Sequence, residues 1–301
     1  MLSHYHSAIN PEVENDSHSC MLRMVGFNKR VLESGCASGH MSEALNARAC
    51  SVVGVEIDPV AAQSALPWLE RVIVGDFDDH VLWEGLKDEY FDVVLFGDVL
   101  EHLHDPLATL RESVKHLLPS GTVVISVPNI AHADVKIALL KGLFPYRDEG
   151  LLDRTHVHFF TKESLMKLVK EAGLVITEFS RVSVPVFSTE IGVARSDVDN
   201  QVLEAVLDDL ESETYQFVVK AVRDDGTNSF ENLSNEFIRL TDELHQASKD
   251  LAELHAKYQE LQERYDEDLR ELPRLRHQKD RVKRLLPGPL AKLAKKALGV
   301  R

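Results

Sequence analysis

The hydrophobic pattern of the 301-residue chain changes its period once, towards the C-terminus. Before that point, short apolar runs typical of strands alternate with stretches in which apolar residues recur every three or four positions, as in amphipathic helices. Beyond it, apolar residues keep an unbroken three-four spacing from Phe230 to Tyr265. The pattern predicts an α/β domain over residues 1–224, a coiled coil over 228–272 and a separate tail over 273–301.

Seven apolar runs in the first part predict strands. They are Val31–Leu32, Val52–Val55, Val72–Asp76, the run from Phe91 to near Asp98, Thr122–Asn129, Leu174–Val184 and Tyr215–Val222. Five strand-helix repeats are complete by residue 130, and repeats of this length build a parallel sheet with helices on its faces. Helix starts are predicted at Ser17, at Asp105 with Pro106, and at Thr161.

The stretch 30–58 reads as strand, glycine turn, helix, strand and acidic residue. Gly35 and Gly39 bracket a tight turn, where the lack of a Cβ lets a ligand lie against the backbone. Glu56 stands at the carboxyl end of the second strand, where an open parallel sheet places its ligand crevice. Because a carboxylate there can accept both hydrogen bonds of a ribose diol, the stretch predicts a nucleoside site.

The residues of the turn distinguish between two nucleoside families. A dinucleotide fingerprint starting at Gly35 would need a third small residue where His40 stands. The string instead resembles E-x-G-x-G-x-G, motif I of the class I S-adenosylmethionine-dependent methyltransferases, carried here by Glu33, Gly35, Ala37 and Gly39. Ala37 departs from the middle glycine of that motif, and its methyl group narrows the turn.

The resemblance implies a Rossmann-like, seven-stranded methyltransferase sheet with helices on both faces and an antiparallel last strand, followed here by the long coiled coil. It also implies S-adenosyl-L-methionine as cofactor. In the family the acid after the third strand contacts the adenine amino group, and the segment after the fourth lines the methionine and acceptor side. The implied cofactor-binding residues are Glu33, Gly35, Ala37, Gly39, Glu56, Asp76 and Asp98.

Transfer to an oxygen also requires a base for the hydroxyl proton. The candidates lie near the fourth strand and after the fifth: Asp98, Glu101, His102, His104, His132, His156 and His158. A structural hydrogen bond is the commoner role for any one such histidine, and among them we expect His156 as the base, with His102 second. The string DVLEH also resembles methyltransferases that bind magnesium at this place, which makes Asp98, Glu101 and His102 alternative metal ligands.

The segment GLLDRTHVHFFT, residues 150–161, bears on the acceptor. It resembles GLLDxTHxRFFT, found in bacterial methyltransferases encoded beside or fused to glycosyltransferases of surface polysaccharide synthesis, with His158 at the usual arginine. The resemblance covers roughly residues 1–222, and the layout of domain, coil and basic end is similar to that of O-antigen chain-terminating methyltransferases. It implies O-methylation of a saccharide. The alternatives are a quinone-type small-molecule O-methyltransferase with magnesium, or an inactive scaffold that presents an oligomeric coil.

The three-four spacing places apolar residues at positions a and d of a heptad repeat. The a positions are Phe230, Phe237, Leu244, Leu251, Tyr258 and Tyr265, and the d positions are Leu233, Leu240, Ala247, Leu254 and Leu261, with Asp268 at the next d. Pro273 is expected to end the helix. We expect a second copy of the chain as partner, against the alternative of a lone amphipathic helix folded on the domain, and the pattern leaves dimer and trimer open.

Charge is unevenly distributed along the chain. The net charge is −15, yet residues 274–301 hold ten Lys or Arg and only one acid. An acidic domain argues against nucleic acid as a partner, because phosphates would be repelled. Residues 285–301 predict a short basic amphipathic helix suited to an anionic membrane surface, with a solvated tail as the alternative.

Two further features indicate the compartment. The three cysteines have neither paired nor C-x-x-C spacing, which favours reduced thiols. The chain has no run of 18 apolar residues and no signal-peptide pattern. We therefore expect a cytoplasmic protein whose only membrane contact is peripheral, at the inner face.

Overall fold

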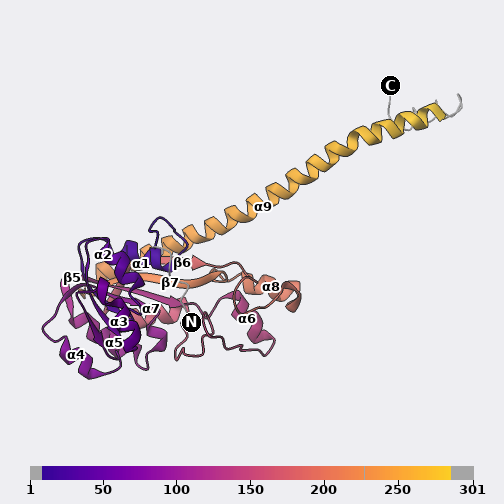
Figure 1. The fold of residues 1–301 in the computed structure, drawn as a ribbon. Helices are drawn as coiled ribbons and strands as arrows, with labels where there is room; N and C mark the ends of the chain where they lie inside the picture. The colour runs from indigo at the N-terminus through magenta and orange to yellow at the C-terminus, as the bar shows by residue number, and fades with distance from the viewer. Residues whose placement is uncertain (1–8, 227, 286–301) are drawn as a thin grey trace. The chain divides into compact units, whose positions relative to one another are not determined.

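A computed structural model describes residues 9–226 and 228–285 of the chain. The chain forms two compact units, Met1–Asp242 and Glu243–Arg301. The first unit is an α/β domain, and the described residues of the second form the greater part of a long helix (Figure 1).

Seven strands form one sheet in the order β3-β2-β1-β4-β5-β7-β6. The first five run parallel, while β7 is antiparallel to both of its neighbours, as the resemblance implies. The strands are β1 (Arg30–Ser34), β2 (Ser51–Glu56), β3 (Arg71–Val74), β4 (Phe91–Gly97), β5 (Leu117–Pro128), β6 (Leu174–Ser183) and β7 (Thr214–Arg223). β5 begins five residues before the predicted start at Thr122, because a register shift against β4 accommodates Pro119 and Gly121 within the strand.

Helices cover both faces of the sheet, as predicted. The helices of the α/β domain are α1 (Ser17–Val25), α2 (His40–Asn46), α3 (Pro59–Ala65), α4 (His80–Gly85), α5 (Pro106–Lys115), α6 (Ala133–Leu140), α7 (Lys162–Glu171) and α8 (Asn200–Leu207). Side chains of a strand alternate between the two faces. Val31 therefore joins a core cluster with α1 and α2, while its neighbour Leu32 joins a cluster with α4, α5 and α7.

A third apolar cluster lies apart from the two faces of the sheet. It joins α6 and α8 with two loop segments, through residues such as Leu152, Ile191 and Val206. The buried carboxylate of Asp134 accepts hydrogen bonds from the backbone of Phe187 and from Thr189, which fastens one of these loops to α6. Figure 1 shows α6 and α8 together beside the sheet.

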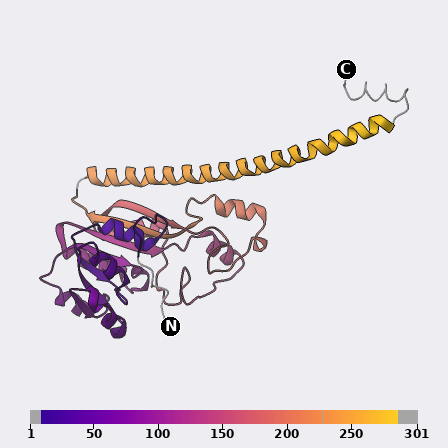
Figure 2. The same cartoon turned by 45° about the horizontal axis from the view of Figure 1, so that its top comes forward.

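The long helix α9 (Asn228–Leu285) contains Pro273. The prediction that Pro273 ends the helix is therefore wrong. A proline inside a helix removes one backbone hydrogen bond, and the flanking leucine, arginine and glutamate residues are strong helix formers that continue through it. Figure 2 shows α9 as one continuous helix. The predicted basic helix at 285–301 lies outside the described residues, apart from Leu285.

The first turns of α9 belong to the α/β domain. Ser234 donates to the carbonyl of Ile176 at 2.6 Å, and Ile238 is buried in the core cluster of α4, α5 and α7. Asp242 forms ion pairs with Lys162 and Arg181. The compact unit thus extends to Asp242, beyond the boundary at residue 224 expected from sequence.

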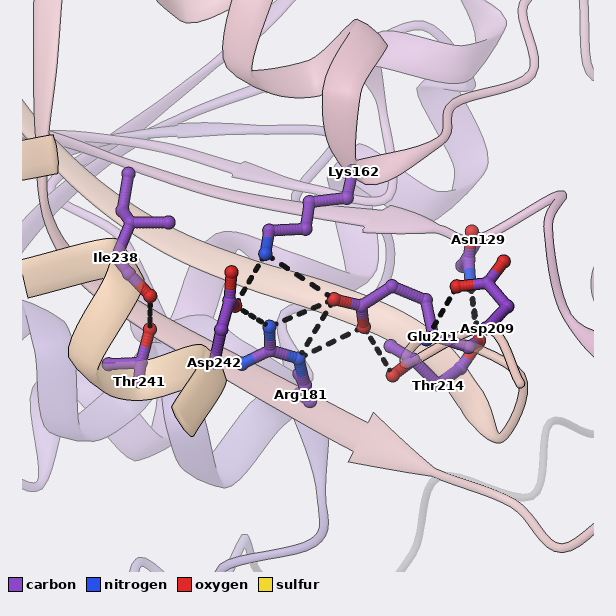
Figure 3. A network of polar contacts seen from close by, with 9 residues as sticks. All are labelled: Asn129, Lys162, Arg181, Asp209, Glu211, Thr214, Ile238, Thr241 and Asp242. Carbon is purple, nitrogen blue, oxygen red and sulfur yellow. Dashed lines mark hydrogen bonds and ion pairs between the residues drawn. The ribbon is translucent and has the colours of Figure 1, made fainter. Parts of the chain in front are cut away.

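Figure 3 shows the polar network at this attachment. Arg181 of β6 is buried and bonds both oxygens of Glu211 as well as Asp242. Burial alone would raise the pKa of Glu211, but the bonds from Arg181 lower it below its usual value. Lys162 and Arg181 each pair with both Glu211 and Asp242, so removing the buried Glu211 would leave two cations against one acid, which is destabilising. Within the described residues, no helix is long and apolar enough to cross a bilayer.

Candidate functional site

The loop between β1 and α2 is a left-handed turn. Gly35, Ala37 and Gly39 have φ angles of 63°, 44° and 90°. A Cβ on Gly35 would lie 2.7 Å from Val99 Cγ2, and one on Gly39 would lie 3.0 Å from Ala65 Cα, so neither position has room for a side chain. Ala37 adopts the same conformation with a Cβ, which costs about 1–2 kcal/mol. Ala37, which departs from the methyltransferase motif, therefore strains the backbone as well as narrowing the turn.

Glu56 is held at the carboxyl end of β2 by this loop. Its Oε2 accepts from the backbone N–H of Ala37 at 2.8 Å, and its Oε1 accepts from that of Asp58 at 2.9 Å. Only 8% of the residue is exposed. Because each carboxylate oxygen has more than one acceptor position, Glu56 keeps capacity for two further donors. That arrangement suits a ribose diol.

A cavity of about 600 Å³ opens in front of this loop. It lies at the carboxyl ends of the parallel strands, where the strand order reverses between β1 and β4. This is the switch point at which open α/β sheets bind ligands. The cavity brings together six of the seven cofactor residues expected from sequence, namely Glu33, Gly35, Ala37, Glu56, Asp76 and Asp98, while Gly39 is not among its lining residues.

One group at the end of β1 and one group in the loop have raised pKa values. Burial raises the pKa of Glu33 to about 7. The negative charge of Glu56 raises this pKa further, whereas a hydrogen bond of 2.5 Å from Ser42 Oγ lowers it. Burial, with the charges of Glu33 and Glu56, raises the pKa of the Cys36 thiol to about 12. The thiol packs where a Cβ on Gly54 would stand, 2.7 Å from Sγ.

Some lining residues were missed by the sequence analysis. α1 contributes His18 and Met21 to the cavity wall, and His18 meets His40 edge-to-face with ring centroids 5.8 Å apart. Asp78 also lines the cavity, and its carboxylate accepts from the backbone N–H groups of His104 and Asp105. The acidic residues after the third strand could have indicated Asp78 from sequence, whereas no residue pattern in α1 indicated that it lines a cavity.

A second group of polar residues lies at the edge of this cavity. We call Glu101, His102 and His156 the histidine cluster, because one ligand atom from each lies within 4.8 Å of the others. His102 lines the cavity. The segment that carries His156 is fastened to the other two residues by the Glu101 carbonyl, which accepts from the N–H groups of Val157 and His158 at 2.8 and 2.9 Å.

Two buried atoms of the histidine cluster have no hydrogen-bond partner, namely Glu101 Oε2 and His156 Nδ1. Glu101 is 1% exposed, and burial followed by the charge of Asp98 raises its pKa well above the usual value. Burial and the nearby His102 lower the pKa of His156. Unpaired buried polar atoms are costly and call for an explanation. A carboxylate with two imidazoles is a donor set that fits a divalent cation.

The other candidate residues have different surroundings. Asp98 Oδ1 accepts from Ser126 Oγ at 2.8 Å and from the amide of Gln216, so the structure groups His156, and not Asp98, with Glu101 and His102. Backbone groups engage both ring nitrogens of buried His132, which caps α6, so this histidine serves the fold. His104 lines the cavity and is exposed. His158 contacts the His104 carbonyl through Nε2.

Relatives of the chain are methyltransferases. The ubiquinone biosynthesis O-methyltransferase of Aeromonas salmonicida is 26% identical over 60% of this chain and 77% of its own. The protein of the same name from Psychrobacter arcticus is 32% identical over 48% of this chain and 58% of its own. A crystal structure of a SAM-dependent methyltransferase from Archaeoglobus fulgidus covers 68% of this chain and 91% of its own, at 18% identity and a TM-score of 0.48. The fold is established by the strand order of the sheet.

A family model described as a methyltransferase domain matches residues 21–178, more than half of the chain. The matched region contains the glycine loop, the histidine cluster and every residue that lines the cavity except His18. Since that match agrees with the strand order and with the nucleoside site, the chain belongs to the methyltransferase domain family and is a class I S-adenosylmethionine-dependent methyltransferase.

Proposed function

We propose that the enzyme methylates a hydroxyl oxygen of a small aromatic acceptor of the quinone type. The observation that carries this proposal is the histidine cluster beside the cofactor cavity, with unpartnered atoms on Glu101 and His156. A group that removes a hydroxyl proton is what O-methylation needs. The names of the two relatives described above support the same acceptor class.

The donor side holds and aligns S-adenosylmethionine. Glu56 accepts the ribose diol, Asp76 contacts the adenine amino group, and the loop at Gly35 leaves room for the methionine end. In the reaction the bond from the methyl carbon to sulfur breaks as its bond to the acceptor oxygen forms, and sulfur leaves as a neutral thioether. Alignment of the two partners in line supplies much of the rate enhancement.

The acceptor side removes the hydroxyl proton. We assign this proton to His156, whose lowered pKa keeps the imidazole neutral and able to accept it near neutral pH. His102 is the second candidate. A divalent ion held by Glu101, His102 and His156 would supply a Lewis acid that lowers the pKa of a coordinated hydroxyl.

The test is transfer of labelled methyl from S-adenosylmethionine to a substituted catechol. We expect product with the native chain, and loss of activity on chelation with recovery on added magnesium would assign the proton step to a hydroxyl bound to the ion. Activity that survives chelation would assign proton removal to the imidazole alone. If no catechol is methylated under conditions that bind the donor, the proposed acceptor class is wrong.

A saccharide is the second candidate acceptor. Residues 150–161, which resemble the glycosyltransferase-linked group, supply His156 and are fastened to Glu101. The motif that suggested a glycan therefore forms the acceptor side of the site. The same assay with an oligosaccharide in place of the catechol decides between the two.

We also propose two associations outside the catalytic site. The heptad repeat of α9 favours self-association, which sedimentation of the full chain would measure. The basic tail favours contact with an anionic membrane, which would place this otherwise cytoplasmic enzyme at the inner face. Liposome flotation with and without residues 285–301 tests this, and equal flotation would remove the membrane contact.

A further inference from the structure

The part of α9 beyond Asp242 exposes a regular row of large apolar side chains. Leu244, Leu251, Leu254, Tyr258, Leu261 and Tyr265 are each between 61% and 69% exposed. They occupy the a and d positions of the heptad repeat. An isolated helix would leave this row in water, and a row of this length and regularity marks an interaction surface.

The α/β domain uses a different face of α9. Ser234, Ile238 and Asp242 contact the domain and are spaced by four residues, which places them on one side of the helix. In the heptad they occupy positions e, b and f. Leu240, at position d, remains 50% exposed. The attachment to the domain therefore leaves the a and d row available to a partner.

The row has two defined ends. On one side Phe237 packs against the core of the α/β domain. On the other side Asp268 places an acid at a d position. The apolar a and d residues between these ends are Leu240, Leu244, Ala247, Leu251, Leu254, Tyr258, Leu261 and Tyr265. They are placed symmetrically about the midpoint between Ala252 and Glu253.

We propose that this row pairs with the same row of a second copy running in the opposite direction, centred on that midpoint. This gives the self-association proposed above a direction and a register. In an antiparallel pair, each a residue faces a d residue of the partner. Leu244 then faces Leu261, and Leu251 faces Leu254. Tyr258 faces Ala247, so a large side chain meets a small one, as close packing requires.

Charges beside the row match this register. In an antiparallel pair the g positions of one helix face the g positions of the other. Centred as above, Asp250 faces Lys257, and Glu243 faces Arg264. Symmetry repeats each contact, which gives four pairs of opposite charge. Such flanking pairs set the direction and the partner of a coiled coil.

Neighbouring antiparallel registers are less favourable. A slide of one heptad in one direction places Asp250 against Asp250 of the partner. A slide in the other direction places Lys257 against Lys257. Among these g positions, either slide keeps two of the four contacts between opposite charges and adds one contact between like charges.

A parallel pair is also less favourable. It would stack Asp268 on Asp268 and leave a gap between two copies of Ala247. Its flanking contacts would set Lys257 beside Gln262, with no opposite charge. A parallel coil would cover Leu272 and Leu275, but Pro273 stands between them and lacks a helical hydrogen bond. The antiparallel seam ends before this region and spans roughly 39 Å.

The first experiment reverses one flanking charge. Lys257→Glu places like charges at two symmetric contacts, so we expect the dimer dissociation constant of the full chain to rise about tenfold in sedimentation equilibrium. Asp250→Lys combined with Lys257→Glu should restore it. Arg270→Glu, at outer position f beyond the seam, is the matched control and should change nothing. Failure of the double variant to restore association would overturn the register.

The second experiment reads the direction. We expect a disulfide between a Leu244→Cys chain and a Leu261→Cys chain after mixing, and none when either chain is oxidised alone. The unsubstituted chain, whose Cys20, Cys36 and Cys50 are buried, is the control. Disulfides within each chain type alone would show a parallel coil and overturn the direction, while leaving self-association intact. A monomer at all concentrations, or a trimer, would overturn the pairing altogether, and the methyltransferase assays are independent of either result.

Discussion

The proposed donor and acceptor sides of the site are built in different ways. Much of the donor side comes from one continuous stretch, Glu33 to Glu56, whose polar groups bond to one another: the Glu56 carboxylate to the backbone of the loop, and Glu33 to Ser42. The acceptor side joins Glu101 and His102 to His156, more than fifty residues later, and leaves two buried atoms without partners.

The donor loop is therefore hydrogen-bonded without a ligand, whereas the acceptor side leaves buried polar atoms without partners. The donor loop has its hydrogen bonds in place before a ligand arrives, so little has to be reorganised on binding. In the histidine cluster, burying Glu101 Oε2 and His156 Nδ1 without partners costs free energy, and a bound hydroxyl or cation would offset that cost. Substitutions on the acceptor side should therefore affect turnover, and those on the donor side should affect binding and stability.

The largest expected effect is on turnover. His156→Gln should lower kcat by about 10²–10⁴-fold, because the base for the hydroxyl proton is lost, while the affinity for S-adenosylhomocysteine stays the same. His158→Gln, on the same segment but outside the histidine cluster, is the matched control. Since the pKa of His156 is lowered from 6.5, activity of the native enzyme should fall only below that pH. Turnover unchanged in His156→Gln would remove His156 from the mechanism.

The next effect is on donor binding. Glu56→Gln replaces acceptor oxygens facing Ala37 and Asp58 with an amide that also donates, and it weakens the bonds to the ribose diol. Two charge-assisted hydrogen bonds correspond to about 3 kcal/mol, so the dissociation constant for S-adenosylhomocysteine should rise about 100-fold in titration calorimetry. Glu43→Gln, on the exposed side of α2, serves as control. If the native chain gives no heat at high micromolar ligand, the scaffold alternative is favoured instead.

A smaller effect concerns stability. The pKa of Glu33 is raised from 4.5 to about 7 in the folded state, so the folded state binds the proton more tightly than the unfolded state. Its contribution to stability is therefore lost as pH rises towards 7. Glu33→Gln has no such dependence. Relative to the native chain, the variant should gain about 2 kcal/mol of unfolding free energy between pH 5 and pH 8, measured by urea denaturation. A difference in unfolding free energy that stays constant across this range would contradict the raised pKa of the buried Glu33 carboxyl.

The smallest effect is at the strained loop. Ala37→Gly should stabilise the domain by about 1 kcal/mol, since glycine adopts the observed φ of 44° without steric cost. The added freedom of the unfolded glycine offsets part of this gain. Ala44→Gly, inside α2, is the opposite control and should destabilise by a similar amount. Destabilisation by Ala37→Gly would mean that the methyl group of Ala37 contributes packing that outweighs the strain.

The same contrast explains what the sequence could predict. All seven strands, the helix over Ser17–Val25 and the cofactor residues around Glu56 follow from local patterns, because neighbouring residues make the structure. The place of the histidine cluster could be anticipated from DVLEH, but its membership could not. His156 joins through hydrogen bonds to the Glu101 carbonyl, and only the folded chain brings those segments together.

Two other features exceeded local patterns. The wall formed by His18 depends on where α1 packs, which no motif records. α9 continues through Pro273 because the helix propensities of the neighbouring residues together outweigh the unfavourable propensity of one proline. The packing of Ile238 against the domain could not be predicted, because Ile238 lies outside the a and d positions that dominate the pattern of the helix.

The thiol of Cys36 has a consequence for the chemistry that the enzyme tolerates. With a pKa of about 12, almost none of it is thiolate at neutral pH, and the thiolate is the form that oxidants and alkylating agents attack. A cysteine in the donor loop would otherwise expose methyl transfer to redox inactivation. Buried against Gly54 and flanked by two acids, this one should remain inert, and iodoacetamide should leave donor binding intact.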